Sequence, residues 1–369
     1  MTHRTDATSQ TSARAQRAPS PPAADPRTLA EVQRAIIAWF ADAARDLPWR
    51  RPGTTPWGVL VSEVMSQQTP MSRVAPRWSA WMAAWPAPAD LAAASPAEVL
   101  LAWDSLGYPR RALRLQECAR TVARDWGGEL PRDEAALLAL PGVGAYTAAA
   151  VASFAYGRRT AVLDVNVRRV LGRVFAGRAH PSAALSKAEA RWAGALVPER
   201  AHVEFNAGAM ELGALVCTSR SPACERCPVA VHCAWLAAGR PADPAAQQKR
   251  AQAWEGTDRQ LRGAIMRVLR EAHASEAGSG AAGTGAAGSA PAGSSDAPGG
   301  ASTGVPEALL TAPTAQLDAE ALDGLPNPVR AAVLRVRELG DGERVQRLAG
   351  DLVSDGLAVR GTAGELCLP

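Results

Sequence analysis

Four cysteines lie close together in the middle of the chain, and their side chains could bind metal. Cys217, Cys224, Cys227 and Cys233 follow the spacing C-x6-C-x2-C-x5-C and are four of six cysteines in 369 residues. Four thiolates in one short loop suit either zinc or an iron-sulfur cluster. Structural zinc sites usually combine two close pairs across a longer span, and this run has a single close pair. The spacing therefore favours a cluster over zinc.

A disulfide framework is a weaker interpretation of the same cysteines. Cysteine is sparse, and the N-terminal sequence MTHRTDATSQTSARAQ has no apolar signal segment. No stretch reaches the roughly 20 apolar residues that cross a bilayer. We therefore expect a reducing, cytoplasmic compartment and no membrane partner. The net charge of +4 is compatible with a polyanionic partner without requiring one.

Two carboxylates stand in settings that predict different acidities. Glu63 lies in GVLVSEVMSQQT (58–69), with apolar residues on nearly every helical face, so desolvation should raise its pKa and make it a proton donor. Asp164 precedes Val167 and Val170 at helical spacing, an N-cap position whose amide donors favour the ionised, depressed-pKa form. Glycosidic chemistry uses such a pair. A satisfied buried glutamate and a plain helix cap are the alternatives.

The string LPGVG (140–144) places Gly142 and Gly144 in a tight turn before a helix of small residues. Backbone amides freed by such a turn suit a phosphate oxygen. A plain interhelical turn is the alternative. The whole string is typical of the hairpin in helix-hairpin-helix DNA-binding proteins, which holds the DNA backbone rather than a base sequence.

Helices must position these residues. From 29 to 240 the chain is a succession of helix-length segments bounded by proline or glycine, which predicts an all-α fold. Residues 1–27 read as a disordered leader and 276–305 as a flexible Gly/Ala/Ser-rich insert. Around this insert, 241–275 and 306–369 form a small C-terminal α+β unit. Its first helix covers 259–270, and its final helix and β-hairpin resemble a winged helix.

Together these strings resemble the adenine DNA glycosylases of the helix-hairpin-helix superfamily, which remove adenine mispaired with 8-oxoguanine. The resemblance spans residues 45–233 and rests on RDLPWR, SEVMSQQT, WDSLGY, LPGVGAYTA, LDVNVRRV, FNAGAMELGALVC and the cysteine run. It implies the helix-hairpin-helix DNA glycosylase fold. A six-helix barrel domain would cover 59–160, and an iron-sulfur cluster domain carrying the aspartate would cover 28–58 and 161–240.

The resemblance also implies an activity. The enzyme would act as a monomer in the cytoplasm, on the nucleoid in a bacterium. It would flip adenine out of double-stranded DNA at A:8-oxoguanine or A:G mispairs, hydrolyse its glycosidic bond and leave an abasic site. Glu63 falls on the general acid that protonates adenine N7, and Asp164 on the carboxylate that stabilises the oxocarbenium-like sugar. Asn166 and Tyr146 match supporting residues.

Further matched positions would bind DNA or the cofactor. Gln67 and Gln68 match residues that probe the opened duplex, and Tyr108 matches the aromatic wedge beside 8-oxoguanine. Arg45 and Trp49 match positions in the adenine pocket. Gly142 and Gly144 match the hairpin. The four cysteines match the ligands of a [4Fe-4S] cluster, whose implied role is to shape a basic DNA-contact loop.

Three other functions fit part of the pattern. Endonuclease III shares the fold and cluster, but it uses a lysine two residues after the second hairpin glycine. Here that position is Tyr146, so the lyase amine is missing. A thymine-mismatch glycosylase can carry tyrosine there, but the segment around Glu63 favours adenine. A non-catalytic mismatch-binding protein would be expected to lack one of the carboxylates, and both are present.

The C-terminal unit departs from many relatives, which append a β domain whose Phe-Ser-His loop reads 8-oxoguanine. This chain has no phenylalanine after Phe205, so that loop is absent. We expect phosphate contacts from the C-terminal unit instead, through Arg259, Arg262, Arg267 and Arg270. A solvated basic face is the alternative.

Overall fold

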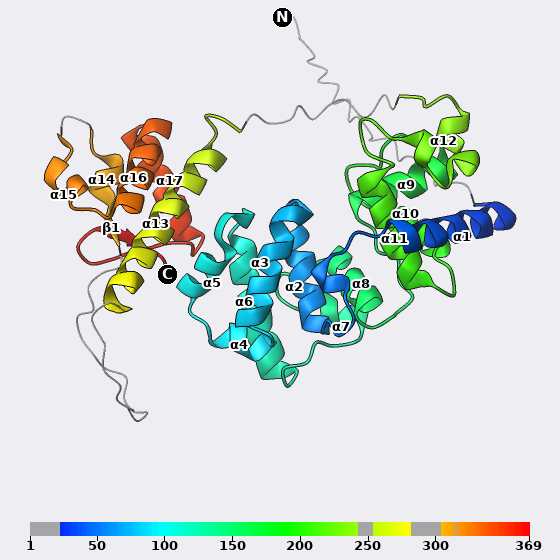
Figure 1. Ribbon diagram of the computed structural model, residues 1–369, viewed down its shortest axis with the longest axis horizontal. Helices are drawn as coiled ribbons and strands as arrows, with labels where there is room; N and C mark the ends of the chain where they lie inside the picture. Colours follow the sequence, from blue (N-terminus) through cyan, green and yellow to red (C-terminus); the bar gives the residue numbers. More distant parts are fainter. Residues whose placement is uncertain (1–22, 243–253, 282–303, 314–315) are drawn as a thin grey trace, which may run out of the picture. The chain divides into compact units, whose positions relative to one another are not determined.

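The computed structural model describes residues 23–242, 254–281, 304–313 and 316–369, and the side chains of 277–281 are left out. The chain divides into two compact units (Figure 1). The cysteine unit comprises Met1–Ala44 and Arg159–Ala246, and the barrel unit comprises Arg45–Arg158 and Gln247–Pro369. The chain first passes from the cysteine unit into the barrel unit after Ala44, whereas the boundary expected from the sequence lies at residue 58. Residues 1–22 of the predicted leader lie outside the described residues, and the first helix already begins at Pro26.

The first part of the barrel unit is helical. Its helices are α2 Pro56–Ser66, α3 Met71–Ala84, α4 Pro88–Ala93, α5 Pro96–Trp103, α6 Arg110–Asp125, α7 Glu134–Leu138 and α8 Ala145–Phe154, with 3-10 turns at Pro48–Arg50 and Asp104–Leu106. Helix α2 begins at Pro56 because Thr55 caps it, its hydroxyl accepting from the Gly58 amide at 3.1 Å. Every residue from 57 to 65 is buried, as expected for a helix that is apolar all round.

Helix α8 packs against α2. It consists largely of alanine, and residues 147–153 are all buried. Small side chains let two helix backbones approach closely, so a longer side chain at the start of α8 can reach α2. The single ionisable group inside α2 is Glu63.

The cysteine unit is also helical. Its helices are α1 Pro26–Ala43, α9 Val165–Ala176, α10 Lys187–Ala195, α11 His202–Leu215 and α12 Ala234–Ala237, with 3-10 turns at Cys224–Arg226 and Ala230–His232. Helix α11 packs against α1 and α9, and glycines make both contacts possible. A Cβ on Gly208 would lie 2.9 Å from Ile36 Cγ2, and one on Gly213 would lie 2.7 Å from Asn166 Cβ. The described residues up to 242 contain no strand, which confirms the all-α prediction for this part of the chain.

The remainder of the barrel unit, here called the C-terminal part, comprises the described residues from 254 onward. It contains α13 Asp258–Ala281, α14 Glu307–Thr311, α15 Ala319–Asp323, α16 Asn327–Leu339 and α17 Gly342–Ser354. Three short strands, β1 Val305–Pro306, β2 Val359–Arg360 and β3 Glu365–Cys367, form an antiparallel sheet in the order β1-β3-β2. Val359 pairs with Cys367, so the predicted terminal hairpin is confirmed. Helix α13 packs against α16 and α17 (Figure 1).

The predicted insert at 276–305 overlaps the end of one helix and the start of one strand. Helix α13 runs to Ala281, inside the segment 276–305, and β1 begins at Val305. Ala272 is the last residue of α13 that the structure shows in the buried core. The rest of that segment, 282–303, lies outside the described residues. Within the part of the chain that the structure describes, no helix has the length and apolarity needed to cross a membrane.

Candidate active site and metal centre

Glu63 lies on α2 inside the barrel unit, where it is 8% exposed. The Tyr146 hydroxyl, from the first turn of α8, donates a hydrogen bond of 2.7 Å to Glu63 Oε2. A buried carboxyl needs such a donor, because an unsatisfied polar group in an apolar setting costs free energy. The contact orients the carboxyl with a phenol, a group that carries no amine nucleophile.

Gln67 and Gln68 follow directly at the end of α2. Gln67 Nε2 approaches Thr147 Oγ1 on α8 at 3.5 Å. Gln68 has a φ of 56°, in the left-handed region that non-glycine residues rarely adopt. Tyr108 shares this property, with a φ of 49° in the turn before α6, and its ring is 39% exposed. Strained backbone at two neighbouring turns is typical of functional sites.

One side chain that the sequence did not single out joins these two turns. Arg111 donates six hydrogen bonds and pairs with no carboxylate among the described residues. Its acceptors are the carbonyls of Val64, Met65, Gln67, Leu106 and Gly107, at 2.6 to 3.4 Å, and the Thr69 hydroxyl at 3.1 Å. Burial lowers the pKa of Arg111 to about 10. The guanidinium therefore caps the carbonyl end of α2 and holds the turn that carries Tyr108.

The hairpin lies between α7 and α8. Gly142 has a φ of 75°, and a Cβ there would lie 3.0 Å from Arg114 Cβ, so both conformation and space require glycine. Gly144 is the N-cap of α8 and provides no side-chain acceptor for the first-turn amides. Gly142 and Gln67 line one pocket with Arg110, Arg111 and Arg114, among others. The two remaining predicted positions, Arg45 and Trp49, also lie in this unit, and the Trp49 ring meets Trp78 edge to face at 5.9 Å.

Asp164 lies in the cysteine unit as the N-cap of α9, as the sequence predicted. Its Oδ1 accepts from the Val167 amide at 2.6 Å, and its Oδ2 accepts from Asn166 Nδ2 at 2.8 Å. The predicted low pKa is wrong: burial raises the pKa of Asp164, although these hydrogen bonds and the charge of Arg169 oppose the shift. Desolvation outweighs the cap because the side chain is largely removed from water.

Asn166 links Asp164 to the cysteine loop through Arg169, a residue that sequence reasoning missed. Arg169 Nη2 donates to Asn166 Oδ1 and to the Gly213 carbonyl, both at 2.8 Å, and its Nε donates to the Cys217 carbonyl at 2.8 Å. Asp164 and the first cysteine are thus joined by one continuous chain of hydrogen bonds.

Arg173 was missed as well. It lies one turn further along α9 and is 1% exposed. Its Nη1 donates to Cys217 Sγ at 3.3 Å and to the Thr218 carbonyl at 2.8 Å, while its guanidinium carbon lies 4.3 Å from the centre of the Trp235 ring. A fully buried guanidinium directed at a thiol suits an anionic sulfur centre.

All four cysteines of the run are free thiols that line one pocket. Burial raises the pKa of Cys227 to about 11, with the neighbouring cysteines adding to the shift, so a bound cation is needed to hold the group as thiolates. Each thiolate of an iron-sulfur cluster binds its own iron, and four thiols that line one pocket fit such a donor set.

Comparisons with known families match both regions. A model of the HhH-GPD superfamily of base excision DNA repair proteins matches residues 61–194, which include Glu63, the hairpin and Asp164. A model of the iron-sulfur binding domain of endonuclease III matches residues 217–233, the cysteine run. Both matches end before the C-terminal part.

Individual proteins are similar over the same region. An adenine DNA glycosylase of Mycolicibacterium smegmatis is 52% identical over 237 residues, which are 64% of this chain and 80% of that protein. A thymine/uracil-DNA glycosylase of Methanothermobacter thermautotrophicus is 33% identical over 205 residues, 55% of this chain and 92% of that protein. Among solved structures, a thermostable thymine-DNA glycosylase aligns with a TM-score of 0.53 at 30% identity, covering 57% of this chain and 98% of its own.

Proposed function

Because the chain belongs to the adenine DNA glycosylases, a family of base excision repair enzymes, we propose that it removes adenine paired with 8-oxoguanine or guanine in double-stranded DNA. The product is an abasic site, and the strand stays intact. The identity of 52% to an adenine glycosylase, against 33% to a thymine/uracil glycosylase, supports adenine as the base that is removed.

The hydrogen bond from Tyr146 to Glu63 carries this proposal. A glycosylase that also nicks DNA attacks the sugar with an amine, and tyrosine offers none. A monofunctional enzyme instead needs a carboxylic acid held in one orientation beside the extruded base. The phenol holds Glu63 in that way, and the apolar residues of α2 surround it.

The reaction begins when adenine leaves the helical stack, at a cost of a few kcal/mol that is least at a mispair. Glu63 then donates its proton to adenine N7. The electrons of the C1′–N9 bond pass to the base, which departs as neutral adenine, and water adds to C1′. General acid catalysis of this kind contributes about 10²- to 10⁴-fold to the rate.

Asp164 stabilises the positive charge that develops on the sugar. Burial alone would favour its protonated form, but Val167, Asn166 and Arg169 all favour the carboxylate. A cationic sugar placed beside it adds a further favourable charge, so the ionised form prevails when it is needed. Asn166 acts as a positioning residue, because it donates to Asp164 and accepts from Arg169.

The duplex is held by the turns that Arg111 joins and by the hairpin. Gln67 and Gln68 test the opened pair, Tyr108 enters beside the base opposite adenine, and Arg45 and Trp49 border the adenine pocket. Gly142 and Gly144 expose backbone amides to a phosphate. These assignments follow the family motif residue by residue, and the shared position of Gln67 and Gly142 at one pocket supports them.

Cys217, Cys224, Cys227 and Cys233 would hold a cluster of the [4Fe-4S] type. Four iron-bound thiolates would cross-link the loop between α11 and α12 and so fix its backbone. That loop carries Arg220 and Arg226 on the surface, where they can meet phosphates. We further propose that the enzyme acts as a monomer in the cytoplasm, on the nucleoid if the cell is bacterial.

Single-turnover base release tests the substrate. Duplexes carrying A opposite 8-oxoguanine, A opposite G, T opposite G and thymine glycol are each incubated with excess protein. We expect adenine from the first two duplexes, no thymine or thymine glycol, and no strand cleavage before alkali. Preferential release of thymine would replace this proposal with the thymine-mismatch alternative. Iron analysis and a broad visible absorption test the cluster in the same preparation.

A further inference from the structure

Four arginines on α13 were expected to contact phosphates, and the structure separates them. Three have carboxylate partners: Arg262 with Asp355 at 2.7 Å, Arg267 with Glu271 at 3.5 Å, and Arg270 with Asp104 at 3.9 Å. Within the described residues, Arg259 has no carboxylate partner. Its charge is therefore the one on this helix that remains available for an anion.

Arg259 stacks between two aromatic rings. Its guanidinium carbon lies 4.6 Å from the centre of the Tyr108 ring and 5.3 Å from that of Trp254. Tyr108 is 39% exposed and Trp254 is 54% exposed. A guanidinium stacked on a ring keeps its N–H groups free to donate in its own plane.

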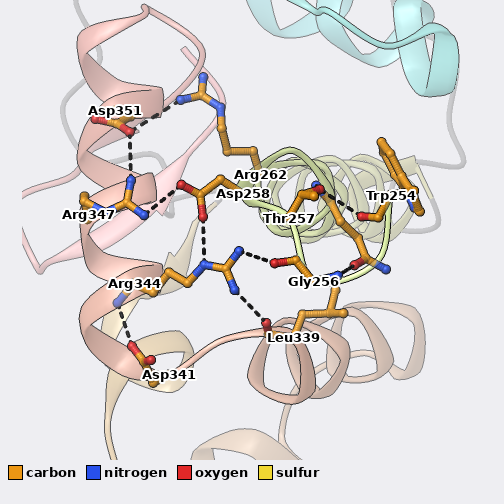
Figure 2. A network of polar contacts seen from close by, with 11 residues as sticks. Trp254, Gly256, Thr257, Asp258, Arg262, Leu339, Asp341, Arg344, Arg347 and Asp351 are labelled. Atoms are coloured by element: carbon orange, nitrogen blue, oxygen red, sulfur yellow. Dashed lines mark hydrogen bonds and ion pairs between the residues drawn. The ribbon is translucent and has the colours of Figure 1, made fainter. Parts of the chain in front are cut away.

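The turn that carries Trp254 and leads into α13 is held on α17 through Gly256 and Asp258, as Figure 2 shows. Asp258 accepts from Arg344 at 2.7 Å and from Arg347 at 2.9 Å. Arg344 also donates to the Gly256 carbonyl at 2.8 Å. The turn thus begins α13 at a defined place, and the exposed stack is preorganised rather than a loose loop.

Separate contacts attach α13 to the first part of the barrel unit. Asp355 accepts from Arg262 and lies 3.2 Å from Arg110, two residues beyond Tyr108, and Arg270 pairs with Asp104 in the turn before Tyr108. These ion pairs already explain how α13 is attached to the first part of the barrel unit. The stack of Tyr108, Arg259 and Trp254 adds an exposed cation with two exposed rings, which is the composition of surfaces that bind unstacked nucleic acid.

We infer that Tyr108, Arg259 and Trp254 form a DNA-binding surface for the strand opposite the extruded adenine. Arg259 donates to a phosphate or to the O8 carbonyl oxygen on the edge of 8-oxoguanine, an acceptor that guanine lacks, and the rings offer stacking faces. The C-terminal part thereby contributes a cation directly beside Tyr108. This inference rests on the proposed function only for the position of Tyr108 next to the opposite base.

Fluorescence anisotropy with the full-length protein tests the surface. The probes are duplexes with 2′-deoxy-2′-fluoroadenosine, which resists hydrolysis, opposite 8-oxoguanine or opposite guanine. Arg259→Ala should weaken binding about tenfold, and Trp254→Ala about fivefold, in keeping with single stacking contacts. Arg259→Lys keeps the charge without the planar fork and should fall between wild type and Arg259→Ala. Arg335→Ala is the matched control, because it removes an exposed arginine of α16 that pairs with Glu338.

The pattern of affinity losses shows which DNA group Arg259 contacts. Equal loss on both duplexes, with a reduced salt dependence, assigns Arg259 to a phosphate. A loss confined to 8-oxoguanine assigns it to the base edge. Affinities within twofold of wild type for Arg259→Ala and Arg259→Lys, or an equal loss for Arg335→Ala, would overturn the inference. A failure of the proposed function would instead appear as no adenine release by wild type, which this binding assay does not measure.

Discussion

Glu63 and Asp164 lie in two regions that hold a carboxyl group in opposite ways. Glu63 is enclosed by the apolar residues of α2 and receives a phenol hydroxyl. Asp164 stands at the start of α9, where a backbone amide, an amide side chain and the charge of Arg169 all favour the anion. Glu63 is buried, whereas Asp164 is of intermediate exposure, and their hydrogen-bond donors differ as well. Under the proposed function, Glu63 is the acid and Asp164 is the carboxylate that stabilises charge.

The two regions also differ in what maintains them. Around Glu63, a large apolar core and the six hydrogen bonds of Arg111 fix the site with the chain's own groups. Around Asp164 the core is smaller, and two buried arginines connect α9 to the cysteine loop. The Asp164 region should therefore depend on the bound cluster, and the Glu63 region should not.

The largest effect is expected when the acid is removed. Glu63→Gln keeps an acceptor for Tyr146 but has no proton to give, so single-turnover adenine release should fall by about 10² to 10⁴. Binding to a duplex with fluoroadenosine opposite 8-oxoguanine should stay within threefold of wild type. Release at the wild-type rate would show that Glu63 takes no part in the chemistry, and the proposed difference between the two carboxylates would then be wrong.

Loss of the cluster should affect the region around Asp164 and leave the region around Glu63 unchanged. Cys227→Ser is expected to lose iron and to raise amide hydrogen exchange at least tenfold in α9 and α11, since metal binding contributes directly to folding. Peptides from α2 and α8 should exchange as in wild type. Cys118→Ser serves as the control because Cys118 lies outside the run. Equal loss of protection in both units would contradict the proposed dependence.

Arg111→Met tests the turns near Glu63. The change removes all six hydrogen bonds to the carbonyl end of α2 and to the turn of Tyr108, so adenine release should slow by about 10- to 100-fold through misplacement of the reacting groups. The fluorescence of 2-aminopurine in place of adenine should show reduced extrusion. Arg120→Met, on the same helix, should behave as wild type. Unchanged extrusion and rate would mean that the turns hold their shape without Arg111.

The smallest effect concerns stability at Asp164. The raised pKa means that its ionised form costs stability once the pH exceeds that pKa. Asp164→Asn should abolish base release, yet melt at the same or a higher temperature than wild type at pH 7. The advantage should shrink as the pH falls through the carboxyl pKa, because wild type then becomes neutral too. If the melting temperature of Asp164→Asn relative to wild type instead rises as the pH falls, the pKa of Asp164 is not raised.

Much of the fold follows from local signals. Asp164 before an apolar helical pattern predicted the start of α9, and the glycines at 142 and 144 predicted the hairpin. The terminal strands were predicted from their turn. These features depend on residues adjacent in sequence, for which caps and turn conformations act directly.

The missed features depend on tertiary packing. Arg111, Arg169 and Arg173 lie on helices with ordinary amphipathic patterns, and periodicity cannot tell which arginine is buried against carbonyls or a thiol. The direction of the Asp164 pKa was missed for a related reason, since the cap is local whereas desolvation is set by the whole unit. Which α13 arginine lacks a carboxylate partner likewise depends on α17 and the turn at Asp104.

The proposed function requires that Glu63 and Asp164 act on a single nucleotide. A crystal structure of the protein bound to a duplex with fluoroadenosine opposite 8-oxoguanine tests it directly. We expect the adenine to be extruded, with the Glu63 carboxyl within about 3 Å of N7 and the Asp164 carboxylate facing C1′ from the other side of the glycosidic bond. An adenine extruded into a pocket that lacks either carboxylate would contradict the account.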